Sequence, residues 1–210
     1  MKKALVIVLI IILIAGIALE YAHRHSSRPA APGAPAAAAM KTYTNTTYGY
    51  SLSYPASLSV EEYPNGDAVI GDITDQNVNG VAETHVLSLS NTPSNVSDND
   101  FVQAAAKQLA NYCAADGPTG SFSCAGVASS TAFTTTNGTN GYELYLNGEM
   151  NNFQTKQKSS VLKGPYFVFP LNTSATSTEI LSIQAPLAQT AAEADASTIE
   201  AIAKSLTLNQ

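Results

Sequence analysis

Hydrophobic and polar positions divide this chain into an apolar start, a small-residue stretch and a long alternating region. All residues from Ala4 to Leu19 are apolar or glycine, and Lys2 and Lys3 precede them. A helix over this run would rise about 1.5 Å per residue and reach roughly 24 Å, short of the ~30 Å bilayer core, so its length lies between that of a spanning helix and that of a signal-peptide core. Because the run is rich in Ile, Leu and Val and leads into Tyr21, whose ring suits the headgroup region, we expect residues 1–25 to form a single membrane anchor.

The segment after the anchor, residues 26–40, is rich in alanine and proline. Spaced prolines prevent a continuous helix, so a semi-extended linker is predicted. The short, lysine-containing N-terminus favours the cytoplasmic side, which would export residues 41–210. Small residues at Gly16 and Ala18 also fit a signal-peptide cleavage site, in which case the domain would be secreted.

Residues 41–210 are long enough for one domain, and their pattern is mainly that of β-strands. Asn-Gly pairs, which tolerate the positive φ angles of tight hairpins, recur through this region. They are Asn65-Gly66, Asn79-Gly80, Asn137-Gly138, Asn140-Gly141 and Asn147-Gly148. The predicted strands around them are Tyr48–Tyr54, Ala68–Ile73, Glu83–Leu89, Val127–Thr136, Tyr142–Met150, Tyr166–Leu171 and Glu179–Gln184. Strands so closely spaced favour an antiparallel sheet.

Two segments instead show helical spacing. Ser97 to Asp100 has the hydroxyl-x-x-acid form of a helix start and precedes an apolar stripe from Phe101 to Tyr112. Thr190 to Glu193 has the same form ahead of a stripe from Ile199 to Leu206. Because each helix has one apolar stripe, each should cover a face of the sheet, which gives an α+β fold.

The start of the domain resembles a known family. The residues are Tyr48-Gly49-Tyr50-Ser51-Leu52-Ser53-Tyr54-Pro55. This segment is similar to the opening strand of the PsbP family, the extrinsic proteins of the photosynthetic oxygen-evolving complex and their bacterial relatives. The general layout over residues 42–210 also matches. The resemblance implies an α/β/α sandwich around an antiparallel sheet. Members of the family are mostly non-catalytic accessory or assembly factors, so the resemblance also implies a role of that kind.

The net charge of residues 41–210 limits the kinds of molecule that this domain can bind. Residues 41–210 hold six Lys or Arg against fifteen Asp or Glu, a net charge of about −9. Such a domain repels phosphate backbones, so nucleic-acid binding is not expected. Lys156, Lys158 and Lys163 form a small basic cluster that we expect to lie on a solvated face.

The two cysteines, Cys113 and Cys124, are eleven positions apart. In an exported domain they are expected to form a disulfide, and two separate buried thiols are the alternative in a reducing compartment. A metal or catalytic role is not expected, because no further Cys or His has ligand spacing around them.

A partial calcium-loop pattern starts at Asp75. Asp75, Asn77 and Asn79 offer oxygen atoms at alternate positions, and Gly80 follows. The twelfth position, where a bidentate glutamate belongs, is Val86. A polar hairpin with an Asn-Gly turn is therefore favoured over a calcium site, and no cofactor is predicted.

His85 and three tyrosines are the remaining candidates. His85 is the only histidine after residue 25, and no Gly-x-Ser-x-Gly motif accompanies it, so a structural histidine is favoured over a hydrolase base. Tyr48, Tyr50 and Tyr54 fall on one side of a predicted strand. Core packing is favoured for them, and an aromatic surface for a sugar or peptide is the alternative.

The sequence predicts an anchored, non-enzymatic PsbP-like domain that binds a protein partner in the cell envelope or helps to assemble it. A hydrolase using His85 and a calcium-stabilised adhesin-like module are the other two hypotheses.

Overall fold

The computed structural model describes residues 39–74, 77–90, 97–113, 115–117, 120–173, 177–187 and 189–209. The predicted anchor and all but the last two residues of the predicted linker lie outside these ranges. Ala39–Gln210 forms one compact unit. In the ranges described, no helix combines the length and the apolar character needed to cross a membrane.

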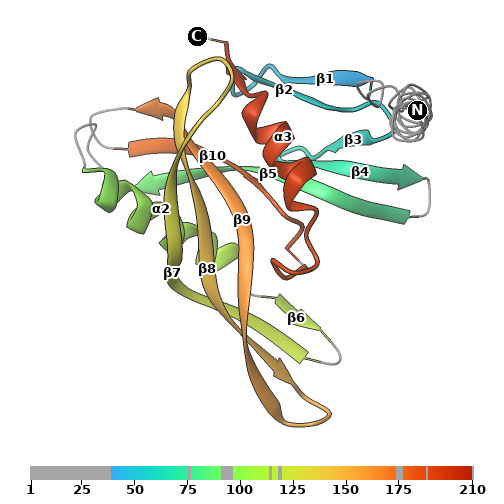
Figure 1. Ribbon diagram of the computed structural model, residues 1–210, viewed down its shortest axis with the longest axis vertical. Helices are drawn as coiled ribbons and strands as arrows, with labels where there is room; N and C mark the ends of the chain where they lie inside the picture. Colours follow the sequence, from blue (N-terminus) through green and yellow to red (C-terminus); the bar gives the residue numbers. More distant parts are fainter. Residues whose placement is uncertain are drawn as a thin grey trace, which may run out of the picture. The chain divides into compact units, whose positions relative to one another are not determined.

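An antiparallel sheet forms the centre of this unit (Figure 1). Its strands follow the order β3-β4-β5-β10-β9-β8-β7-β6. Their bounds are β3 Ser59–Glu62, β4 Ala68–Thr74, β5 Asn77–Ser90, β6 Ala115–Gly117, β7 Gly120–Thr134, β8 Asn140–Asn152, β9 Gln157–Thr173 and β10 Ser177–Gln184. All neighbouring strands pair antiparallel, which confirms the sheet type expected from the hairpin spacing.

A smaller sheet and two helices complete the fold. The smaller sheet has the order β1-β2-β11, with bounds β1 Met40–Asn45, β2 Tyr50–Pro55 and β11 Thr207–Leu208. The helices are α2 Asp98–Cys113 and α3 Ala196–Lys204. The chain's last strand, β11, pairs with β2 near the start of the domain.

Alternation along the central strands separates two cores. On β9, Phe167 and Phe169 join the core formed with α3 and the small sheet, whereas Tyr166 and Val168 join the core under α2. Successive side chains of a strand point to opposite faces, so the two helices cover opposite faces of the large sheet. The α+β prediction of a sheet covered by helices is confirmed.

The first helix start is as predicted and the second is not. Ser97 Oγ accepts a hydrogen bond from Asp100 N at 3.3 Å, as a capping residue does. The Thr190-to-Glu193 segment forms a separate turn, in which Glu193 accepts bonds from the Thr190 amide and hydroxyl. Helix α3 begins later, where Asp195 accepts from Thr198 N at 3.1 Å.

The predicted Asn79-Gly80 turn is also wrong. Both residues lie inside β5, where Asn79 pairs with Asp72 and Gly80 pairs with Gly71 beside a register shift. A Cβ atom on Gly71 would lie 2.3 Å from the Asn79 carbonyl oxygen, so glycine permits a close approach of the two backbones here. An Asn-Gly pair therefore marked a bulge rather than the end of a hairpin.

Candidate functional site

His85 lies on β5 between two carboxylates. Its Nδ1 is 2.9 Å from Asp67 Oδ2, and its Nε2 is 3.3 Å from Glu83 Oε2. The His85 side chain is 13% exposed, and the ring of Tyr112, near the end of α2, lies 5.9 Å from the imidazole. Asp67 also accepts a hydrogen bond from Asn65 Nδ2 at 2.8 Å. The strand pairing of β4 with β5 brings these groups together.

The two carboxylates decide the charge of the imidazole. Burial alone would lower its pKa, but the hydrogen bonds and charges of Asp67 and Glu83 outweigh burial and raise the pKa of His85 to about 9. Burial likewise opposes ionisation of Asp67, and the bond to His85 outweighs it and lowers the pKa of Asp67. His85 is therefore protonated at neutral pH, and both ring nitrogens are engaged. In this state it offers no lone pair to a serine or water nucleophile.

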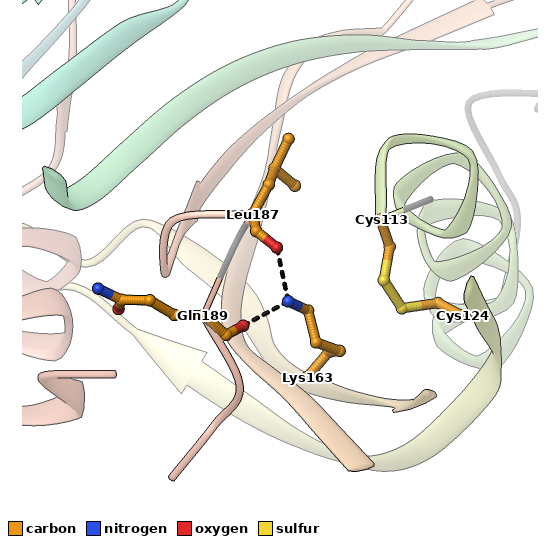
Figure 2. The surroundings of a disulfide bond; sticks show 5 residues. All are labelled: Cys113, Cys124, Lys163, Leu187 and Gln189. Carbon is orange, nitrogen blue, oxygen red and sulfur yellow. Dashed lines mark hydrogen bonds between the residues drawn. A yellow bond between two sulfur atoms is a disulfide. The ribbon is translucent and has the colours of Figure 1, made fainter. Parts of the chain in front are cut away.

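The predicted disulfide partners meet at the end of α2 (Figure 2). The Cα atoms of Cys113 and Cys124 are 5.8 Å apart, within the range for a disulfide, and the two sulfur atoms are bonded. The bond connects the last residue of α2 to β7. The structure thus places the two cysteines at disulfide distance, in agreement with the predicted pair.

Lys163 contradicts the predicted basic surface cluster. Its residue is 1% exposed, and its Nζ donates to the Leu187 carbonyl oxygen at 2.6 Å and to the Gln189 carbonyl oxygen (Figure 2). The ammonium also lies 4.5 Å from the ring centroid of Phe122. Burial lowers the pKa of Lys163. Its bonds hold the segment after β10 against β9, a structural role.

The three candidate tyrosines do not share an exposed face. Tyr50 and Tyr54 are 0% and 8% exposed and belong to the core beside α3, which agrees with the favoured interpretation of core packing. The Tyr50 hydroxyl donates to Thr84 Oγ1 at 3.2 Å. Tyr48 lies outside β2, in the turn after β1, and is only partly buried. An aromatic surface made from all three rings is therefore not formed.

Tyr48 instead lines a cleft. The cleft has a volume of about 450 Å³, and its lining residues are Thr47, Tyr48, Glu62, Tyr63, Pro64, Asn65 and Gly66. They come from the turn between β1 and β2, from the last residue of β3 and from the turn between β3 and β4. Sites for small ligands have volumes of roughly 300–1,000 Å³. The lining of the cleft therefore contains one tyrosine that the sequence indicated as a candidate, together with residues that it did not indicate.

Asn45 holds the two sides of the cleft together. It is fully buried, and its Nδ2 donates to the Gly66 carbonyl oxygen at 3.0 Å and to the Tyr43 hydroxyl at 3.1 Å. Its Oδ1 accepts from Tyr48 N at 3.0 Å. The signal available in the sequence was Asn65-Gly66 after Tyr63-Pro64, which marks a turn. Nothing local indicated that Asn45 would reach it.

The structure describes only part of the calcium-loop candidate. Asp75 lies outside the described residues, whereas Asn77 and Asn79 lie in β5. The described ranges contain no group of three or more His, Cys, Asp or Glu side chains arranged to hold a metal ion. A calcium site at these positions stays an untested prediction.

Among the solved structures that resemble this chain are two proteins of low sequence identity. No family model matches the sequence, and no curated protein matches it. The solution structure of cyanobacterial PsbP (CyanoP) from Synechocystis is 13% identical, with a TM-score of 0.40 over 86% of this chain and 98% of that one. A Bacteroides thetaiotaomicron crystal structure is 14% identical, with a TM-score of 0.32 over 81% of this chain and 48% of that one. At these TM-scores neither likeness carries an argument about function.

Proposed function

We propose that this chain is a membrane-tethered, non-catalytic PsbP-like domain that binds a protein partner outside the cytoplasm, in the cell envelope. The tether is the apolar run from Ala4 to Leu19, and the Cys113–Cys124 disulfide favours an oxidising compartment. The family resemblance of Tyr48–Pro55 supports an accessory role rather than an enzymatic one.

The contacts of His85 with two carboxylates are the observation that carries the non-catalytic part of the proposal. A general base must be deprotonated and within hydrogen-bond reach of the proton that it removes. Asp67 and Glu83 occupy both ring nitrogens of His85 and keep it charged. The opposing residue on β10, Ser182, donates its hydroxyl hydrogen to Gln184 Oε1 at 2.9 Å, so that hydrogen is not donated to the imidazole. The hydrolase hypothesis thus has less support than the binding hypothesis.

Location is tested on the full-length chain produced in a bacterial host. We expect it to sediment with membranes, to be digested by protease added to spheroplasts, and to show thiols that react with an alkylating reagent only after reduction. A soluble cytosolic product with two reactive thiols would contradict the proposal.

Catalysis is tested with His85→Gln. Wild type and His85→Gln are expected to show the same background hydrolysis of ester, peptide and glycoside substrates. An activity that wild type shows and His85→Gln abolishes, with the fold preserved by circular dichroism, would overturn the non-catalytic assignment.

A further inference from the structure

We propose that the cleft between the β1–β2 and β3–β4 turns binds an arginine side chain of the partner protein. This inference rests on the proposed binding function and names the chemistry of the contact. It follows from the lining, the hydrogen bonds and the charge of the cleft.

Hydrogen bonds connect the two sides of the cleft before any ligand arrives. Asn45 ties the Tyr48 amide on one side to the Gly66 carbonyl on the other. The Tyr48 hydroxyl donates to the Asn65 carbonyl oxygen at 3.3 Å, and the Gly66 amide donates to the Tyr63 carbonyl oxygen at 2.8 Å. A site that is already ordered loses little conformational entropy on binding.

Glycine at position 66 sets how closely the two turns approach. Gly66 has φ of +85°, and a Cβ atom there would lie 2.3 Å from Cε2 of Tyr48. The Tyr48 ring therefore packs directly against the turn that carries Tyr63. This contact places the two aromatic residues in the lining of one cleft.

Charge and aromatic character select the ligand. The lining contains the carboxylate of Glu62 and the rings of Tyr48 and Tyr63, and no lysine or arginine is among its residues. Within the described part of the chain, the ion pairs do not include Glu62. A carboxylate disfavours an anionic ligand, whereas aromatic rings and a carboxylate together favour a cation.

A guanidinium group fits this lining better than an ammonium. It is planar, it stacks on aromatic faces, and it presents several N–H donors to a carboxylate. Tyr63 is 40% exposed, so its ring is accessible from solvent. The negative charge of the domain would also attract a basic partner segment at a distance.

The test is a titration of the full-length ¹⁵N-labelled chain in uncharged detergent, followed by NMR. The probe is a glycyl-arginyl-glycine peptide with blocked ends, and its control is the same peptide with citrulline, which has nearly the same shape without the charge. The arginine peptide is expected to shift the amide signals of residues 47–49, 62, 63, 65 and 66, and to bind at least fivefold more tightly than the citrulline peptide.

Two matched pairs of variants assign the contacts. Glu62→Gln is expected to weaken binding about fivefold, whereas Glu61→Gln removes the same charge from the opposite face of β3 and should leave binding within twofold. Tyr63→Phe keeps the ring and is expected to retain binding, and Tyr63→Leu is expected to lose most of it.

Equal effects of Glu61→Gln and Glu62→Gln would overturn the proposal, as would equal binding of the two peptides. If a neutral oligosaccharide shifts the amide signals of these turns and the arginine peptide does not, the cleft binds a sugar and the proposed cation is wrong. A negative result in the titration can be distinguished from a negative result in the fractionation experiment. An exported domain that ignores arginine refutes only this inference, and a cytosolic product that binds arginine refutes only the proposed location.

Discussion

Replacement of Asn45 by alanine should destabilise the domain more than replacement of an exposed asparagine. The side chain is fully buried and takes part in three hydrogen bonds, to the Gly66 carbonyl oxygen, the Tyr43 hydroxyl and the Tyr48 amide. A net contribution of about 1 kcal/mol per bond gives a loss of about 3 kcal/mol in the free energy of unfolding. For a domain of this size, that loss corresponds to a decrease in melting temperature of roughly 6–12 °C.

Urea unfolding of the full-length chain in detergent, followed by near-ultraviolet circular dichroism, measures this change. Asn147→Ala is the matched control, because Asn147 is exposed on β8 and its loss should change stability by less than about 0.5 kcal/mol. The double variant of Asn45→Ala with Tyr43→Phe should lose less than the sum of the two single changes, because both remove one hydrogen bond. A loss below about 1 kcal/mol for Asn45→Ala would refute the idea that Asn45 holds the two turns together.

Three further predictions concern stability. The pKa of His85 is raised from about 6.5 to about 9 on folding, so its stabilising contribution is complete below pH 6.5 and is lost as the pH rises to about 9. The urea midpoint of wild type should fall across this interval while that of His85→Gln changes less, and parallel curves would exclude the mechanism. The double variant Cys113→Ala/Cys124→Ala should lose about 3 kcal/mol for its eleven-residue loop, and reduction of wild type should match it; an unchanged midpoint in both would argue against the bond. Asp195→Ala should cost about 1 kcal/mol in thermal melts because Thr198 N loses its capping acceptor, and an unaltered melting temperature would show that this cap contributes nothing.

The sequence was most informative where a local pattern had one structural solution. The alternating runs predicted the central strands because a period of two is specific to a strand with a buried face. The Ser97 start was found because its cap forms within one turn of helix. The same pattern failed at Thr190, where the bonds to Glu193 close an isolated turn and Asp195 supplies the real cap.

The cleft could not be predicted in the same way. Asn45 and Gly66 are twenty-one positions apart, and only the packing of the small sheet beside β3 and β4 allows their hydrogen bond. Lys163 belongs to a lysine-rich run, yet its stem is buried and its ammonium meets carbonyls more than twenty residues away. In both cases the partners are distant in the sequence.

By itself, the sequence determined the strand-rich pattern, the acidic charge, the apolar run from Ala4 to Leu19 and the pair of cysteines available for a bond, because each depends on residue type or near neighbours. The tertiary structure decided that His85 contacts two carboxylates, that Tyr50 is buried in the core and that Tyr48 lines a cleft. Hydrogen bonds and burial are properties of groups brought together in space, and alternation along one strand cannot specify which groups will meet there.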